Sequence, residues 1–281
     1  MKKLFTFIGL ILLTFYLFSC SQPPSSENNA GPEKKEGKKL KIGLVLSVGG
    51  RGDKSFNDSA YRGLIWARDR LGVEVTEGQP KQMAEDESYI RTFAEEGYDL
   101  VIGVGFLMKP AIEKVAKEFP DQKFAIVDEV VDAPNVASLV FEEHEGSFLV
   151  GALAGLKTTS GKIGFIGGMD VPLIHKFEVG FVEGVKYTNP DAEVFIKYIG
   201  STSDAFHDPT KGKQLANTLF NQEIDIIYHA AGSSGSGVIE AAAEKNKLAI
   251  GVDSNQNYMK PGFVLSSMVK QVDVAVFEII K

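Results

Sequence analysis

The chain has 281 residues, of which 44% are hydrophobic and 24% are charged, and its formal net charge is -7. These proportions are typical of a soluble globular protein with room for two lobes. The negative charge argues against nucleic acid as a partner, because a nucleic-acid binder needs a basic surface. Cys20 is the single cysteine of the sequence, which excludes a disulfide within the chain.

The first 19 residues are typical of a signal peptide. Lys2 and Lys3 precede an apolar run at 4–18, which is short for a membrane span. Cys20 follows at the position where bacterial lipoproteins are cleaved and lipidated. Phe18 is bulkier than the small residue usual there, so an ordinary signal peptide with an incidental cysteine is the alternative.

Residues 20–39 contain no large apolar side chain and predict a disordered tether. Signal peptide, lipidated cysteine, tether and globular body together describe a protein anchored by lipid to the bacterial cell membrane. The sequence predicts that the body faces the periplasm or the cell exterior.

From residue 40 onward, apolar runs of strand length alternate with segments of helical periodicity. We expect strands at 40–46, 73–76, 100–104, 123–127, 136–141, 162–166, 193–199, 224–228, 248–252 and 263–267. We expect helices at 60–71, 85–96, 108–119, 145–156, 176–187, 211–222, 238–245 and 271–280. Strands separated by helices predict an α/β fold with parallel sheets. The helix at 145–156 is rich in glycine and alanine, so it should pack closely against another backbone.

The alternation restarts after a joint near residues 141–160. We therefore expect two doubly wound parallel-sheet lobes, the first made of 40–143 plus 269–281 and the second of 144–268. In this scheme the last strand and helix, at 263–281, would cross back to the first lobe. The sequence ends inside a predicted helix, which is what a truncated chain would show.

The segment 47–58, rich in glycine, joins the first predicted strand to the first predicted helix. Such turns lie at the carboxyl ends of parallel strands, where open α/β folds bind ligands. Asp53 stands between Gly52 and Lys54, so the segment is not a phosphate-binding loop. The alternative is a plain turn in which Asp58 caps the helix.

Carboxylates and aromatic side chains recur near the other predicted strand ends. The candidate ligand-binding residues are Asp53, Phe56, Asn57, Phe106, Asp128, Phe177, Gly232, Asp253 and Lys270. Aromatic faces beside carboxylates suit a nucleoside or a sugar. The alternatives are that the aspartates are caps, that Phe177 belongs to the core and that Lys270 is solvated.

Signatures of catalysis are mostly missing. Gly103-Val-Gly105 lacks the third glycine of a dinucleotide fingerprint, and the serines of the segment 232–237 do not form a nucleophile elbow. The four histidines show no metal-ligand spacing, and Glu142, Glu143 and Glu145 are expected on a solvated face. The sequence therefore predicts a binding protein without cofactor, metal or enzymatic activity.

Motifs spread over the whole body carry a family resemblance. They are Gly52-Asp-Lys-Ser-Phe-Asn57, Gly103-Val-Gly-Phe106, Ala125-Ile-Val-Asp128, Glu145-Gly-Ser-Phe-Leu-Val-Gly151, Gly161-Lys-Ile-Gly-Phe-Ile-Gly-Gly168, Phe177-Glu-Val-Gly-Phe181, Gly251-Val-Asp253 and Ser266-Ser-Met-Val-Lys270. With the leader that ends at Cys20, their order and spacing make the chain resemble the basic membrane protein family of bacterial substrate-binding lipoproteins. The similarity is closest to the purine nucleoside receptors of that family.

The resemblance implies a type I periplasmic-binding fold with three hinge crossings and a partnership with the permease of an ABC importer. It implies that Phe56 and Phe177 sandwich a purine and that Asn57 and Asp128 bind the base. Asp253 and Lys270 would then bind the ribose hydroxyls, with Asp53 and Gly232 nearby. Family members run longer than this chain, so a last strand and helix would be missing here. A sugar or signalling molecule as ligand, and a nucleoside hydrolase, remain the alternatives.

Overall fold

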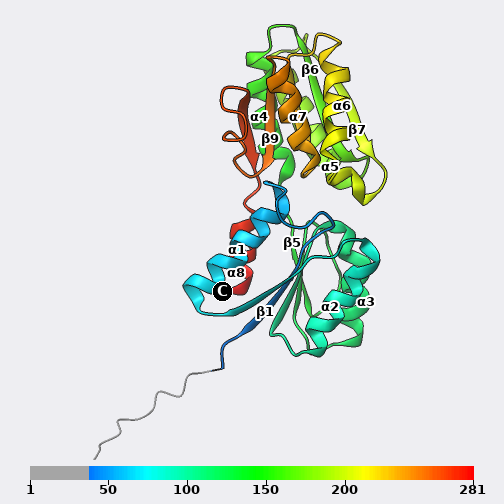
Figure 1. Ribbon diagram of the computed structural model, residues 1–281, viewed down its shortest axis with the longest axis vertical. Coiled ribbons are helices and arrows are strands. Elements are labelled where there is room, and N and C mark those ends of the chain that lie inside the picture. The colour runs from blue at the N-terminus through cyan, green and yellow to red at the C-terminus, as the bar shows by residue number, and fades with distance from the viewer. Residues whose placement is uncertain (1–37) are drawn as a thin grey trace, which may run out of the picture. The chain divides into compact units, whose positions relative to one another are not determined.

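The computed structural model describes residues 38–281 of the protein. This part contains two five-stranded parallel sheets (Figure 1). The strand order is β2-β1-β3-β4-β5 in the first sheet and β10-β9-β8-β6-β7 in the second. The first sheet comprises β1 (Lys41–Val45), β2 (Glu74–Gly78), β3 (Leu100–Val104), β4 (Phe124–Val127) and β5 (Val136–Leu139). The second comprises β6 (Lys162–Met169), β7 (Glu193–Gly200), β8 (Ile226–Ala230), β9 (Leu248–Asp253) and β10 (Val264–Val269).

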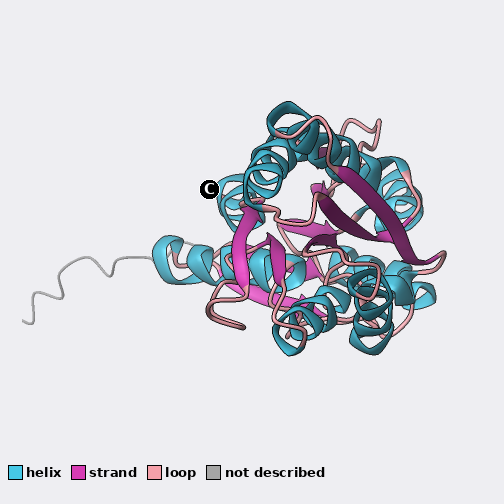
Figure 2. Cartoon of the chain, turned by 90° about the horizontal axis from the view of Figure 1, so that it is seen from above, coloured by secondary structure: helices cyan, strands magenta, loops and turns pink. Residues whose placement is uncertain are grey.

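Helices alternate with these strands along the chain. They are α1 (Phe56–Leu71), α2 (Asp86–Glu95), α3 (Lys109–Glu118), α4 (Glu143–Lys157), α5 (Pro172–Thr188), α6 (Pro209–Phe220), α7 (Ser234–Glu244) and α8 (Val272–Ile280). Short 3₁₀ turns precede three of them: η1 (Met83–Glu85), η2 (Phe106–Met108) and η3 (Ser203–Phe206). The predicted order of strands and helices is confirmed, although α1, α5 and α7 each begin about a turn earlier than expected. Figure 2 shows helices surrounding the strands.

The inner strands of each sheet are buried on both faces, which explains why they appear as continuous apolar runs in the sequence. In β1 and just after it, Ile42, Leu44 and Leu46 join one hydrophobic cluster, whereas Val45 joins the cluster on the opposite face. This alternation follows from the two-residue period of a strand. The second sheet likewise separates two apolar clusters.

Helices α4 and α5 touch backbone to backbone, as the small residues of α4 predicted. A Cβ atom added to Gly151 would collide with the carbonyl oxygen of Phe181, and one added to Gly184 would collide with that of Phe148. Only glycine permits this approach. The contact fixes α4 to α5 and makes both helices part of the second lobe, which we define as β6–β10 with α4–α7.

The first lobe comprises β1–β5 with α1–α3 and α8. Within residues 38–281 the chain passes between the lobes twice, at 140–142 and at 270–271. The last strand does not return to the first lobe as expected, because β10 pairs with β9 in the second sheet. Helix α8 does return: it lies beside α1, where Asp273 accepts a 2.8 Å hydrogen bond from Arg62 (Figure 1). The third crossing that the resemblance implies stays a prediction.

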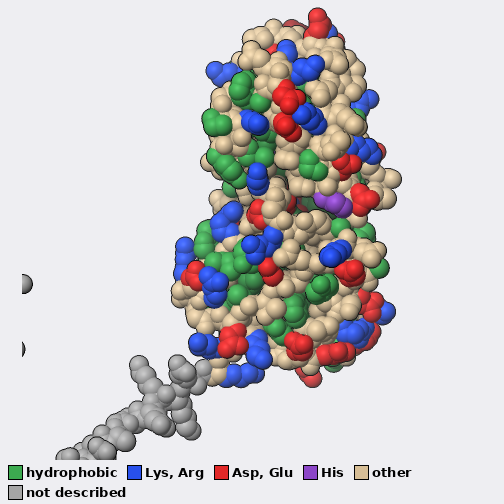
Figure 3. All heavy atoms as spheres, in the orientation of Figure 1, with side chains coloured by type: hydrophobic (Ala, Val, Ile, Leu, Met, Phe, Trp, Pro, Cys, Tyr) green, Lys and Arg blue, Asp and Glu red, His purple; other side chains and the backbone are tan. Residues whose placement is uncertain are grey.

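On the face shown in Figure 3, Lys and Arg side chains are interspersed with Asp and Glu over the described residues. No helix among residues 38–281 has the length and apolar content needed to span a membrane. The predicted signal peptide, Cys20 and nearly all of the predicted tether lie outside the described residues.

Candidate ligand-binding site

A pocket, partly open to solvent, lies where the carboxyl ends of strands from both lobes meet. All nine residues predicted from the sequence line it: Asp53, Phe56, Asn57, Phe106, Asp128, Phe177, Gly232, Asp253 and Lys270. Strand-end position was sufficient to group them, and their contact with a ligand stays a prediction.

The carboxylate of Asp53 organises the turn between β1 and α1. Its Oδ1 accepts hydrogen bonds from the backbone N–H groups of Ser55 and Asp58, at 2.9 and 3.0 Å. Its Oδ2 accepts from Asn57 at 2.7 Å. Burial raises the pKa of Asp53 to about 6, and the three N–H donors oppose this rise. Asp53 therefore caps the first turn of α1.

The alternative that Asp58 caps α1 is wrong. Asp58 lies inside the helix, and its carboxylate reaches back to accept from the N–H groups of Gly52 and Lys54 at 2.8 and 2.9 Å. The two aspartates thus hold the glycine-rich turn from both sides. Because the turn is held in this way, the first two side chains of α1, Phe56 and Asn57, face the pocket.

The amide of Asn57 is engaged with the end of β1. Its Oδ1 accepts from both the backbone N–H and the hydroxyl of Ser47, each at 3.0 Å, and its Nδ2 lies 3.5 Å from the carbonyl oxygen of Ser47. The oxygen is saturated, whereas the amino group retains donor capacity. Asn57 can therefore offer a ligand a donor rather than an acceptor.

Lys270 is the centre of a buried cluster of charges. Its Nζ lies 2.6 Å from Asp128 Oδ2 and 3.1 Å from Glu143 Oε1. Burial alone would lower the pKa of Lys270, but the carboxylates of Asp128, Asp253 and Glu143 outweigh it and raise that pKa. Lys270 is 6% exposed and Glu143 is 1% exposed. The alternative that Lys270 is solvated and the expectation that Glu143 lies on a solvated face are therefore wrong.

Two aspartates at the ends of strands face this cluster of charges. Each of their carboxylates can accept further hydrogen bonds. Asp128, after β4, keeps Oδ1 buried without a hydrogen-bond partner among the described residues. Asp253, at the end of β9, accepts from the Ser55 hydroxyl at 2.6 Å, a contact between the lobes. Burial raises the pKa of each aspartate to about 6, against the opposing charge of Lys270.

Both aspartates adopt the left-handed backbone conformation, with φ of 73° at Asp128 and 63° at Asp253. Non-glycine residues rarely do so, and such backbone strain gathers at functional sites. Gly232 shows a similar constraint, with φ of 53° and space for no Cβ atom beside the carbonyl of Phe206. The ends of three strands are thus shaped around the pocket.

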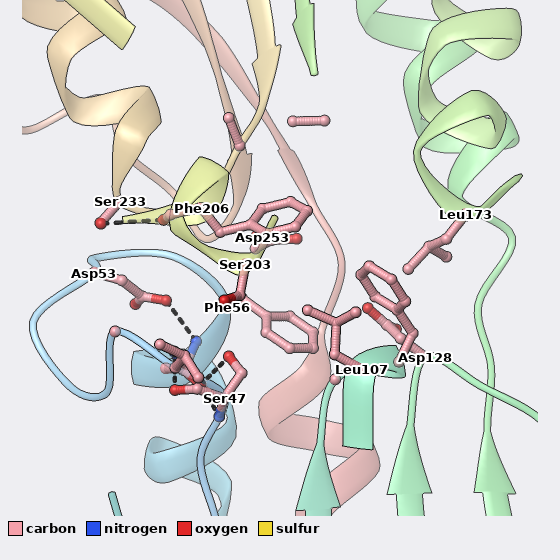
Figure 4. Close-up of a pocket in the computed structure, with 18 of the residues that line it drawn as sticks. Ser47, Asp53, Phe56, Leu107, Asp128, Leu173, Ser203, Phe206, Ser233 and Asp253 are labelled. Carbon is pink, nitrogen blue, oxygen red and sulfur yellow. Dashed lines mark hydrogen bonds between the residues drawn. The ribbon is translucent and has the colours of Figure 1, made fainter. Parts of the chain in front are cut away.

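Aromatic rings line the pocket from both lobes. Lys270 Nζ lies 5.4 Å from the ring centre of Phe56 and 5.2 Å from that of Phe177. Phe177 also belongs to the core of the second lobe, as the alternative held, and its contact with a ligand stays a prediction. Phe106 and Phe206 meet edge to face at 6.1 Å. Figure 4 shows Phe56 and Phe206 entering the pocket from opposite lobes, with Asp253 beside them.

Sequence reasoning missed three polar or aromatic residues of this region: Asp86, Glu143 and Phe206. Asp86 and Phe206 line the pocket from segments that follow β2 and β7, so the strand-end rule applied to every strand would have found them. Glu143 gave no signal, because its burial depends on Lys270 from the distant end of the chain. No cluster of three or more His, Cys, Asp or Glu residues suited to a metal ion occurs within the described part of the chain.

Comparison with known proteins identifies the family. The family model described as "ABC transporter substrate-binding protein PnrA-like", Bmp, matches residues 39–281. The chain belongs to the Bmp family. It is thus a substrate-binding protein of an ABC transporter, which binds a small molecule and works with a transporter.

Relatives and solved structures agree with this membership. This chain is 36% identical over 276 residues to "ABC transporter nucleoside-binding protein BmpA" of Lactococcus lactis. The match covers 90% of this chain and 78% of the relative. The chain is 35% identical over 286 residues to an "uncharacterized lipoprotein" of Pyrococcus abyssi, covering 98% and 71%. A solute-binding protein of an ABC transporter system from Aeropyrum pernix superposes with a TM-score of 0.79 at 36% identity, covering 85% and 69%. These matches confirm the predicted family and the two-lobed α/β fold.

Proposed function

We propose that this protein captures purine nucleosides in the pocket between its lobes and passes them to the permease of an ABC importer. The observation that carries the proposal is the buried, unpartnered Oδ1 of Asp128 among aromatic rings. A buried acceptor without a partner costs free energy, which a ligand N–H donor recovers. Purines offer such donors on a flat ring that stacks on phenylalanine.

The base lies between Phe56 and Phe177 in this proposal, one ring from each lobe. Asp128 accepts a hydrogen bond from the base, and the amino group of Asn57 donates one. Asp53 acts through the loop that it caps, because backbone N–H groups occupy both of its oxygens.

The ribose lies against Asp253 and Lys270, with Gly232 allowing close approach of the backbone. A carboxylate that accepts from ribose hydroxyls selects ribonucleosides over deoxyribonucleosides, because a missing hydroxyl leaves a buried acceptor unpaired. Inosine, guanosine and adenosine are the expected ligands. The name of the relative from Lactococcus lactis, a nucleoside-binding protein, supports this ligand class.

The protein is held at the outer face of the bacterial cell membrane by lipid on Cys20, and it does not catalyse a reaction. The lone cysteine after an apolar leader supports the anchor, as does the relative from Pyrococcus abyssi that is named a lipoprotein. The aspartates of the pocket do not form, among the described residues, the metal-holding cluster that a nucleoside hydrolase needs, which favours binding over hydrolysis.

Calorimetric titration and thermal shift with inosine, guanosine, adenosine, glucose and galactose test the proposal. We expect the nucleosides to raise the melting temperature of the wild-type protein. Phe56→Ala should weaken their binding about 5- to 150-fold, from stacking of about 1–3 kcal/mol.

Phe148→Ala is the matched control, because Phe148 packs on Tyr187 at 5.6 Å and does not line the pocket. It should bind nucleosides as the wild type does. Stabilisation by glucose or galactose, with no response to any nucleoside, would reject the proposal in favour of a sugar-binding protein. Release of free base from inosine would show catalysis.

A further inference from the structure

Asp86 and Asp128 line the pocket from segments that follow different strands of the first sheet. Asp86 is the first residue of α2, which follows the edge strand β2, whereas Asp128 follows β4. Strands β1 and β3 lie between β2 and β4 in the sheet. Three strand spacings separate β2 from β4, roughly 14 Å. Asp86 nevertheless lines the same pocket and is only 3% exposed.

The carboxylate of Asp86 is not satisfied by the protein. Its Oδ1 is buried and has no hydrogen-bond partner, and no ion pair to Asp86 occurs among residues 38–281. Burial raises its pKa to about 7, and the neighbouring negative charge of Glu85 adds to the rise. An acid kept in this state destabilises the folded protein. Such costs persist where a residue serves function.

Asp128 shows the same feature, since it too lines the pocket with an unpartnered Oδ1. The first lobe thus presents two unmatched acceptors to a single pocket, from segments after strands that lie three spacings apart. A ligand that satisfies both needs hydrogen-bond donors at both of its ends. A purine nucleoside has this form, with donors on the base and on the ribose.

We propose that Asp86 is a specificity-determining residue, whose carboxylate accepts a hydrogen bond from an N–H or O–H group at the end of the ligand farthest from Asp128. The inference rests on the proposed function and deepens it. It also predicts a penalty for a phosphate at that end, because a phosphate would face a buried carboxylate.

Asp86→Asn tests this role while keeping the size of the side chain. We expect inosine to bind the variant about ten- to a hundred-fold more weakly in calorimetric titrations, since a hydrogen bond to a charged group is lost. We expect the melting temperature of the ligand-free variant to rise, because a buried, unpaired acid is removed. A purely structural residue would not show this combination.

Glu85→Gln is the matched control. It removes the adjacent charge from a residue that does not line the pocket, and its affinity for inosine should stay within about twofold of the wild type.

Analogues of inosine identify the donor. 1-Methylinosine and the 2′-, 3′- and 5′-deoxyinosines remove the donors of inosine one at a time. The analogue that loses affinity for the wild type, but binds Asp86→Asn as inosine does, lacks the group that Asp86 contacts. If each of the four analogues loses affinity by the same factor in Asp86→Asn as in the wild type, direct contact is rejected.

Two further outcomes separate this inference from the proposed function. If inosine binds the wild type and Asp86→Asn within twofold of each other, the inference fails and the proposed function stands. If inosine, guanosine and adenosine all fail to bind the wild type, the proposed function is rejected and the inference with it.

Discussion

The ammonium nitrogen of Lys270 lies 2.6 Å from Oδ2 of Asp128, and this buried ion pair joins the segment after β10 to the segment after β4. It therefore connects the two lobes at the floor of the pocket. Glu143, at the start of α4, approaches the same nitrogen at 3.1 Å. One cation thus compensates carboxylates from separate parts of the chain.

Lys270→Met should lower the free energy of unfolding by about 3–5 kcal/mol, because it leaves buried carboxylates without their counter-ion. Urea denaturation monitored by circular dichroism measures the change. Lys176→Met is the control: Lys176 pairs with Glu143 at 3.3 Å, but its side chain is 46% exposed, so the loss should be at most about 1 kcal/mol. Equal losses for the two variants would contradict the central role of Lys270.

Glu143→Gln should destabilise the protein by about 1–3 kcal/mol, because a charged group in a buried cluster is replaced by a neutral amide. The same urea titration measures it. Glu145→Gln, two residues away on the exposed side of α4, should change stability by no more than about 0.5 kcal/mol. If both variants behave like Glu145→Gln, Glu143 does not compensate Lys270.

Gly184→Ala should separate α5 from α4, because the new methyl group would meet the carbonyl oxygen of Phe148. The intrinsic helix preference for alanine, about 1 kcal/mol, works in the opposite direction, so a net loss of stability isolates the collision. We expect a melting temperature several degrees below that of the wild type.

Gly200→Ala is the matched control for this contact. The added Cβ atom would lie 3.5 Å from Ala205, an ordinary distance, and the melting temperature should stay close to that of the wild type. A stabilised Gly184→Ala would show that the two helices have room to separate.

Acid should act in opposite directions on stability and on binding. The pKa values of Asp128 and Asp253 are raised to about 6 in the ligand-free protein, from an ordinary 3.8. Between about pH 4 and 6 the folded state therefore binds more protons than the unfolded state, and these groups stabilise it as the pH falls. A ligand donor needs the ionised carboxylates, so affinity for inosine should weaken below about pH 6.

Thermal shift of the free protein and calorimetric titration with inosine, from pH 8 to pH 5, measure the two trends. The affinity should level off only towards pH 8, above the pKa of about 7 of Asp86. Tighter binding in acid would show that the ligand offers acceptors rather than donors to these aspartates.

The sequence was informative where position along the chain determines position in space. Parallel strands buried on both faces produce long apolar runs, so the order of the strands along the chain was predictable. The strand ends of the two lobes were expected to face one cleft, so Asp128, after a strand of the first lobe, and Asp253, at the end of a strand of the second, could be assigned to one site. The family motifs assigned roles to those positions.

The remaining features depend on contacts that no local pattern records. The N–H groups that Asp53 accepts from are brought together only once its turn is folded, so the sequence offered its capping role only as an alternative. Glu143 stands in a charge run typical of a solvated face, and Lys270 arrives from the other end of the chain to pair with it. Asp86 and Phe206 differ from these, because the strand-end rule reaches them once it is extended through the short 3₁₀ turns that follow β2 and β7.

Lys270 lies in the short segment between β10 and α8, where the chain passes from the second lobe back to the first. The same residue therefore belongs to the pocket floor and to the connection about which the lobes would move. We therefore expect a substitution at this position to change ligand affinity and the movement of the lobes together. Kinetic measurements that follow lobe closure and ligand binding separately should show that a substitution of this side chain changes the rates of both steps.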